Sequence, residues 1–244
     1  MGFALNGCID GFSRRLMWLE TGPSNNNPAV VAHYFVECVR TLEVVPMHMR
    51  TDCRTENGTL AAIQCTLRSG HNDYFAGPRS HMFGSSTSNQ RIESWWSFFR
   101  KGSAQFWIQL FGDMQTQGHF NGSHEHQCLM RFCFGALIQV ELQECRQLWN
   151  LHRVCQSRFS RCPGGIPDEL YNLPHRYDSR DCGFPINIQD LVQFQQFTER
   201  QDICGDAELK RMFLQEVTRN NLAIPENWEN GVELYLNLKE LVML

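Results

Sequence analysis

The stretch Phe3-Ala4-Leu5-Asn6-Gly7-Cys8-Ile9-Asp10-Gly11 decides the fold, because it reads as a buried strand that runs directly into a turn. The residues from Leu16 to Leu19 have the character of a partner strand, so we expect a hairpin. Asp10 would then stand at the end of the first strand. Carboxyl ends of strands are where α/β folds usually build their sites, so Asp10 is a candidate for chemistry.

Two further acidic residues follow predicted elements. After a helix that begins at Asn27-Pro28, a β-rich segment over residues 43–50 leads to Asp52 at the end of another strand. A helix is predicted over residues 89–101 and carries Glu93; its apolar stripe consists of Ile92, Trp95, Trp96 and Phe99. If the two strands are neighbours in one sheet, Asp10 and Asp52 lie side by side, and Glu93 approaches from the helix.

Three carboxylates on rigid elements are typical of a site for divalent metal. Mg²⁺, or Mn²⁺ in its place, prefers oxygen ligands and needs only a few acidic side chains. Two such ions about 4 Å apart stabilise the attacking and leaving oxygens in phosphodiester cleavage or transfer. We therefore predict that Asp10, Asp52 and Glu93 are metal ligands and catalytic residues. The competing interpretation makes Asp10 a turn residue, Asp52 a helix cap and Glu93 a solvated helix position.

The helix that carries Glu93 also offers a surface for nucleic acid. Helical spacing places Asn89, Ser97 and Arg100 on the face of Glu93, and Lys101 follows. Hydrogen-bond donors and cations of this kind suit a phosphate backbone. We predict that this face contacts DNA.

A basic stretch lies farther along the chain. Arg146, Arg153, Arg158 and Arg161 occur with no acidic residue between them, and Arg153 is our further candidate for DNA binding. A solvated helix face explains the stretch equally well. The net charge of -4 is unfavourable for DNA binding, but the acidic residues are concentrated beyond Pro185.

Three blocks of sequence carry a resemblance to a known family. They are Cys8-Ile9-Asp10-Gly11-Phe12-Ser13-Arg14, Arg50-Thr51-Asp52-Cys53-Arg54-Thr55-Glu56-Asn57-Gly58 and Ser88-Asn89-Gln90-Arg91-Ile92-Glu93-Ser94-Trp95-Trp96. In this order they resemble the catalytic blocks of an integrase core domain, of the retroviral integrase and DDE transposase superfamily. Within that superfamily the blocks resemble most those of integrase-like proteins of transposon origin in animal genomes. The resemblance continues through Trp149-Asn150-Leu151-His152-Arg153 and Pro163-Gly164-Gly165-Ile166-Pro167-Asp168, and covers roughly Phe3 to Pro174.

The resemblance implies a fold and an activity. The fold is α/β, with an RNase H-like mixed sheet flanked by helices and a helical C-terminal extension. The activity is metal-dependent DNA strand cleavage or strand transfer, from a domesticated or truncated mobile element. Asp10, Asp52 and Glu93 would form the metal-binding triad, and Asn89 and Arg100 would line the DNA face. We expect Mg²⁺ or Mn²⁺ as cofactor, DNA as partner, a possible homo-oligomer and a nuclear location.

Two departures from the family pattern support an alternative, a catalytically inactive scaffold that binds DNA or protein. Relatives usually have glycine at the position of Arg54; if that position needs a positive φ, arginine strains the loop that holds Asp52, and otherwise Arg54 simply points to solvent. The chain also begins at the first core strand, without the amino-terminal DNA-binding region that relatives usually carry.

Length and composition set the remaining expectations. We divide the 244 residues into an integrase core over 1–118, a helical extension and turn-rich connector over 119–184, and an acidic helical segment over 185–244. No apolar run suggests a membrane helix or signal peptide, and the eleven scattered cysteines favour reduced thiols, so we expect an intracellular protein. A zinc site at His124, His126, Cys128 and Cys133 is disfavoured, because finger spacing is lacking.

Overall fold

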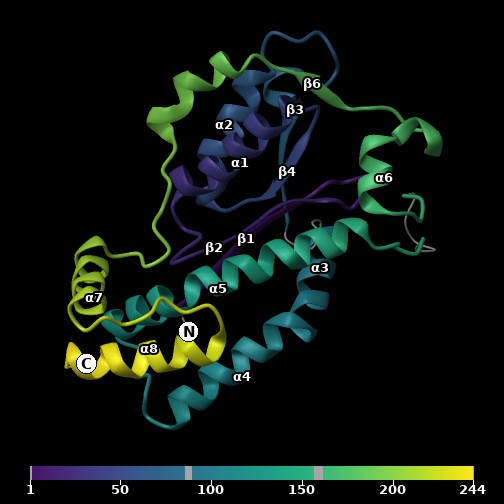
Figure 1. The fold of residues 1–244 in the computed structure, drawn as a ribbon. Helices are drawn as coiled ribbons and strands as arrows, with labels where there is room; N and C mark the ends of the chain where they lie inside the picture. The colour runs from purple at the N-terminus through teal and green to yellow at the C-terminus, as the bar shows by residue number, and fades with distance from the viewer. Residues whose placement is uncertain (1, 86–89, 157–161, 244) are drawn as a thin grey trace.

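The structure is a computed structural model that describes residues 2–85, 90–156 and 162–243. The strands are β1 (Ala4–Ile9), β2 (Leu16–Gly22), β3 (Val44–Pro46), β4 (Met49–Asp52), β5 (His81–Gly84) and β6 (Gly183–Pro185). The α-helices are α1 (Pro28–Leu42), α2 (Gly58–Leu67), α3 (Gln90–Lys101), α4 (Ser103–Thr116), α5 (His124–Leu151), α6 (Pro167–Asn172), α7 (Ala207–Arg219) and α8 (Trp228–Leu241). Short 3₁₀ helices are η1 (Thr55–Asn57), η2 (Gly77–Ser80), η4 (Pro174–Tyr177) and η5 (Ile188–Phe197). The α/β class is confirmed, with helices predominating (Figure 1).

The β1–β2 hairpin lies between two hydrophobic clusters. Leu16 and Leu19 of β2 belong to a cluster built around α5, whereas Trp18 belongs to a second cluster around α1 and α2. Trp18 and Leu19 point to opposite faces, as successive residues of a strand do, and the register shift opposite Cys8 and Ile9 places Leu16 on the same side as Leu19. Figure 1 shows the result: α1 and α2 on one side of the hairpin and the long α5 on the other.

The strands do not pair as the sequence suggested. We expected the strands that end at Asp10 and Asp52 to be neighbours in one mixed sheet. Among the described residues, β1 pairs with β2, β3 with β6 and β4 with β5, each as a separate two-stranded sheet. Only β4 and β5 run parallel, with Asp52 opposite Gly84. Asp10 and Asp52 therefore end strands of different sheets.

The hairpin and several helices follow the predicted pattern. The β1–β2 hairpin is antiparallel, and α1 begins after Asn27, whose side chain accepts a hydrogen bond from the Ala29 amide at 3.0 Å. Two features were not foreseen: the strand β5, and the 3₁₀ helix η5 within the segment over 185–244 that we expected to be helical. The strand was missed because four residues with glycine at the end give almost no alternation, and their partner β4 lies some thirty residues away in sequence.

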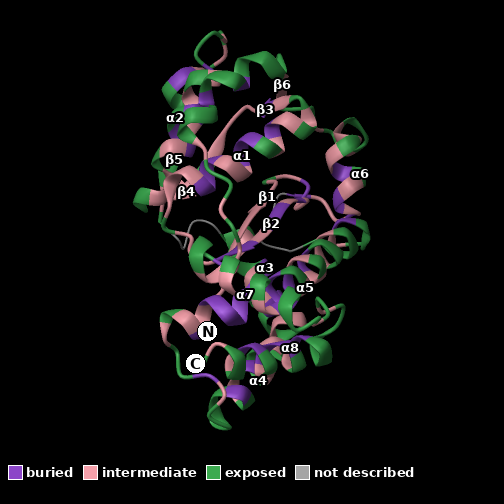
Figure 2. Cartoon of the chain, turned by 60° about the vertical axis from the view of Figure 1, so that its left-hand side comes forward, coloured by how far each residue is buried: buried purple, intermediate pink, exposed green. Residues whose placement is uncertain are grey.

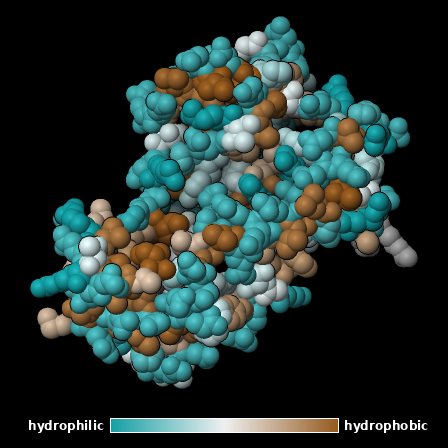
Figure 3. All heavy atoms as spheres, in the orientation of Figure 1, coloured by the Kyte–Doolittle hydropathy of each residue, from teal (hydrophilic) through white to brown (hydrophobic). Residues whose placement is uncertain are grey.

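The C-terminal segment packs against both clusters. Leu191 and Phe194 of η5 join the cluster around α1, while α7 and α8 pack on α5 through Phe213, Tyr235 and Leu238. In Figure 2, α7 and α8 each carry buried positions beside exposed ones, as amphipathic helices do. Figure 3 shows that apolar atoms also reach the surface around α7 and α8 and over the η5 segment. No described helix combines the length and apolar character of a membrane span.

Candidate metal and nucleic-acid site

The turn after β1 holds Asp10 in one orientation. Its Oδ2 accepts hydrogen bonds from the Phe12 amide at 3.1 Å, the Ser13 amide at 2.7 Å and the Ser13 hydroxyl at 2.7 Å. No described residue hydrogen-bonds to Oδ1. One oxygen is thus fixed by the turn while the other can accept a cation, and a half-buried carboxylate of this kind fits the oxygen preference of Mg²⁺.

Residues far along the chain clamp this turn. Arg14 has a left-handed φ of 65°, and its carbonyl accepts a hydrogen bond from Trp149 Nε1 at 2.8 Å. Arg15 pairs with Asp168 at 2.7 Å. The buried Asn150 side chain bonds both backbone groups of Leu16, at 2.8 and 3.0 Å. The two sequence blocks beyond the triad therefore have a structural role: they anchor the segment that positions Asp10.

Asp52 lies at the end of β4, and the following η1 turn folds back on it. The Asn57 side-chain amide donates to Asp52 Oδ1 at 2.6 Å. Arg54 Nε lies 3.4 Å from Asp52 Oδ2, and Arg54 Nη1 lies 3.9 Å from Glu56 Oε1. The Asp52 carboxylate is therefore met by a neutral donor on one oxygen and by a positive charge on the other.

Arg54 causes no backbone strain. Its φ of -84° and ψ of 152° are those of an extended residue, which any side chain adopts. The strain considered from the sequence is therefore absent at this position. Arg54 is largely exposed, as the other interpretation supposed, but it is also paired with Asp52.

Glu93 is exposed in the first turn of α3. The buried side chains of that helix are Trp95 and Phe99, as the apolar stripe predicted. Arg91 Nη2 lies 3.2 Å from Cys162 Sγ, and the same sulfur lies 3.5 Å from the Gly11 carbonyl oxygen. These contacts connect the start of α3 with the Asp10 turn.

The three carboxylates do not form a closed cluster. Within residues 2–85, 90–156 and 162–243, no three histidine, cysteine, aspartate or glutamate side chains gather closely enough to hold a metal ion. The structure connects the Glu93 helix with the Asp10 turn, whereas the neighbours of Asp52 come from η1 and β5. A metal shared by all three carboxylates would require this arrangement to change.

A family model described as an integrase core domain matches residues 1–166. The chain belongs to the integrase core domain family. No match was found among curated proteins or among solved structures.

The matched region of this integrase core domain ends between the clamp residues Asn150 and Asp168. It includes β1 with the following Asp10, β4, α3 and all of α5 with the Trp149 and Asn150 anchors. The anchor Asp168 lies just beyond it. The helices α7 and α8 lie outside the matched region, although they pack on α5.

The predicted nucleic-acid residues of the integrase core lie on exposed positions where the structure describes them. Ser97, Arg100 and Lys101 are exposed on α3, and the Ser97 hydroxyl donates to the Glu93 carbonyl at 3.0 Å. Arg153 is exposed just after α5. Asn89 lies outside the described residues, as do Arg158 and Arg161 of the basic stretch. Arg146 donates to the Met17 carbonyl at 3.0 Å, so it braces β2.

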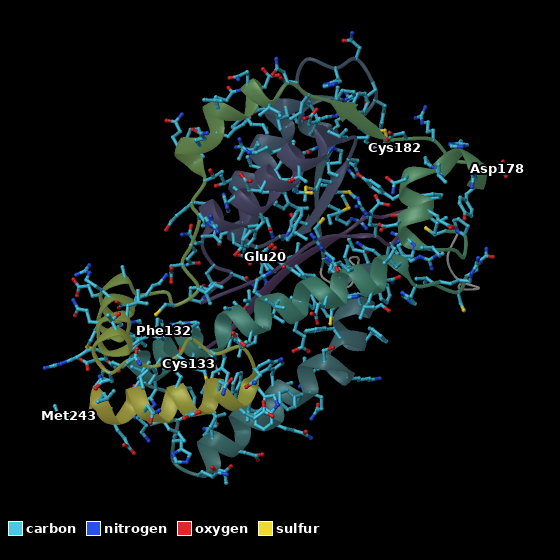
Figure 4. All side chains as sticks on the ribbon, viewed as in Figure 1. Glu20, Phe132, Cys133, Asp178, Cys182 and Met243 are labelled. Atoms are coloured by element: carbon cyan, nitrogen blue, oxygen red, sulfur yellow. The ribbon has the colours of Figure 1, made fainter. Side chains whose placement is uncertain are left out.

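The residues of the disfavoured zinc site pack and bond with the C-terminal helices. His126 Nδ1 lies 2.6 Å from the Tyr235 hydroxyl of α8, and His124 Nε2 lies 3.0 Å from Asp206. Cys133 is buried on α5 (Figure 4), and burial raises the pKa of its thiol well above the usual value. A thiol that stays protonated acts as an apolar core atom.

Sequence reasoning missed the residues that orient the carboxylates. Ser13 and Asn57 follow Asp10 and Asp52 by three and five residues, at spacings where side chains commonly bond back to a turn. That local signal was available. Asn150 acts over 134 residues of sequence, and no local pattern points to its role.

Proposed function

We propose that this integrase core domain is a metal-dependent polynucleotidyl transferase or endonuclease that acts on DNA. The observation that carries the proposal is the family match over residues 1–166 together with the fixed Asp10 carboxylate at the end of β1. The family alone supports an integrase or transposase type of function. The fixed turn supports Asp10 as a ligand, because a preorganised carboxylate binds a cation without a further ordering cost.

In the proposal, Asp10, Asp52 and Glu93 hold Mg²⁺ or Mn²⁺. Bound there, divalent ions would supply charge stabilisation for the oxygens that attack and leave a phosphorus. Ser13 holds Oδ2 of Asp10, which would leave Oδ1 for an ion, whereas Asn57 holds Oδ1 of Asp52 and an ion at Oδ2 would have to displace Arg54. The exposed position of Glu93 on α3 leaves it accessible to DNA and to the ions.

The DNA backbone would lie along α3 and the region that follows α5. The proposed contacts are Asn89, Ser97, Arg100, Lys101 and Arg153. Arginine and lysine would pair with phosphate oxygens, and such contacts position DNA without reading its sequence. A nuclear location, assembly into a homo-oligomer and origin from a mobile element belong to the same proposal.

A nicking assay tests this function. Supercoiled plasmid is incubated with the full chain and Mg²⁺ or Mn²⁺, and Asp52→Asn is compared with wild type. We expect wild type to relax the plasmid and Asp52→Asn to lose most of that activity. Asp178→Asn is the matched control, because Asp178 is an exposed aspartate that follows η4 and belongs to a different part of the fold from β4 (Figure 4). Equal nicking by wild type and Asp52→Asn would refute the enzyme.

A non-catalytic DNA-binding scaffold is the second candidate, and the Arg54–Asp52 ion pair favours it. A guanidinium 3.4 Å from Asp52 Oδ2 neutralises the carboxylate without a metal. This protein would bind DNA through α3, with an affinity that falls as salt rises, and would leave the DNA intact. Salt-sensitive binding that depends on Arg100, without metal-dependent nicking, would identify the scaffold.

A further inference from the structure

Arg54 is placed to compete with a cation for Asp52. Its Nε lies 3.4 Å from Asp52 Oδ2, and its Nη1 lies 3.9 Å from Glu56 Oε1. The guanidinium therefore stands between two carboxylates of the same turn. A second positive ion that approaches Oδ2 would meet a full positive charge within a few ångströms.

The other carboxylate oxygen of Asp52 has an uncharged partner. Asn57 donates a neutral hydrogen bond to Oδ1 at 2.6 Å. A metal ligand can keep such a bond, because carboxylates that bind metals are commonly hydrogen-bonded in turn. Only Arg54 has to move when a cation arrives at Oδ2. Its side chain is 72% exposed, so it can swing into solvent.

We propose that Arg54 is a tethered counter-cation that lowers the affinity of Asp52 for divalent metal. The proposal rests on the proposed function, since it concerns the same metal site. Arg54 is a positioning residue in this scheme: it controls whether the Asp52 carboxylate is available. Because the ion pair is exposed, solvent screens it, and its loss should tighten metal binding roughly twofold to fivefold.

The backbone conformation at Arg54 allows other side chains to be tested at this position. Arg54 is extended, so neither glutamine nor lysine introduces strain there. Arg54→Gln removes the charge and keeps most of the length, whereas Arg54→Lys keeps the charge. Arg219 provides a matched control on α7: it is 79% exposed and pairs with Glu216 at 3.6 Å, far from β4 in Figure 1.

The experiment measures Mn²⁺ binding to the full chain by electron paramagnetic resonance, with no DNA present. We compare wild type, Arg54→Gln, Arg54→Lys, Arg219→Gln and the double variant Arg54→Gln/Asp52→Asn. The expected result is a Kd for Mn²⁺ that falls roughly twofold to fivefold in Arg54→Gln alone. Arg54→Lys and Arg219→Gln should match wild type, and Asp52→Asn should abolish the gain.

Three other outcomes would overturn the role of Arg54, and one of them would also refute the metal site. Unchanged affinity in Arg54→Gln, with binding that still depends on Asp52, would overturn the role of Arg54 and leave the metal site in place. Equal tightening in Arg54→Lys would overturn it too, because the charge would not be the cause. If neither wild type nor Arg54→Gln bound Mn²⁺ through Asp52, both this proposal and the proposed metal site would be refuted.

Discussion

Asn150 is buried where the end of α5 meets the start of β2. Its Oδ1 accepts a hydrogen bond from the Leu16 amide at 2.8 Å, and its Nδ2 donates to the Leu16 carbonyl at 3.0 Å. One side chain thus bonds both backbone groups of a strand residue, as a neighbouring strand would. Through this pair, α5 holds β2 and with it the turn that carries Asp10.

Asn150→Ala should destabilise the protein. The substitution leaves the amide and carbonyl of Leu16 buried without their partner, at a cost of about 1–3 kcal/mol for each group. We therefore expect the free energy of unfolding to fall by about 2–4 kcal/mol in urea titrations. Asn220→Ala is the control: Asn220 bonds Glu216 at the exposed end of α7, and its loss should change stability by less than about 1 kcal/mol. Equal losses in the two variants would contradict the role of Asn150.

For single residues, a structural role could be predicted from the sequence only when the interacting residues are close together in the chain. The position of Asp10 at a strand end followed from the stretch Phe3 to Gly11, because the strand and the turn are both local. The contact of Arg15 with Asp168 joins residues 153 positions apart and could not be inferred. Arg54 lies between these cases: its presence was noted, but the φ that decides strain was visible only in the structure.

Among the elements, α8 has one face buried against α5 and another face exposed to solvent. Leu238 is fully buried against α5, whereas Leu241, three residues later, is 42% exposed. Leu238→Ala should lower the free energy of unfolding by about 2–5 kcal/mol, because it leaves a cavity in the cluster. Leu241→Ala should cost less than about 1 kcal/mol. Urea unfolding of the two variants checks this, and similar costs would show that α8 does not dock as described.

The contact between α5 and α8 also predicts a pH dependence. Burial lowers the pKa of His126 below its usual value, with Lys239 adding to the effect. Above the ordinary histidine pKa of about 6.5 both folded and unfolded states are neutral, so stability is full. As pH falls below that value the unfolded chain binds the proton first, so stability decreases until the lowered folded pKa is reached.

His126→Gln should weaken this pH dependence. Urea unfolding at pH 7.5 and pH 5.5 measures the loss of stability in wild type and in the variant. The pKa values of His33, His48 and His81 are also lowered by burial, but these residues remain in both proteins, so the difference isolates His126. An identical loss in the two proteins would show that His126 titrates normally.

Local signals predicted helices better than strands. The Asn27 cap and Pro28 marked the start of α1, and the apolar stripe marked α3. Strand β5 was missed because parallel pairing with β4 is decided by tertiary contacts. The arrangement of sheets was wrong for the same reason, since strand order is not encoded in the strands one at a time.

At the scale of the whole molecule, the β1–β2 hairpin joins two hydrophobic clusters. One contains α1, α2 and η5, and the other contains α3, α4, α5, α7 and α8. The C-terminal helices therefore contribute to the cluster that supports the Asp10 turn, although they lie outside the matched integrase core. Their acidic residues, which account for the negative charge of the tail, remain on the surface away from the packed faces.

The most direct test of the shared metal site is anomalous diffraction from crystals of the full chain soaked in Mn²⁺. The account predicts an anomalous peak within coordination distance of the Asp10 and Asp52 carboxylates, with Glu93 on the same ion or on a second one beside it. A peak at neither aspartate, in crystals whose contacts leave both carboxylates open, would contradict it.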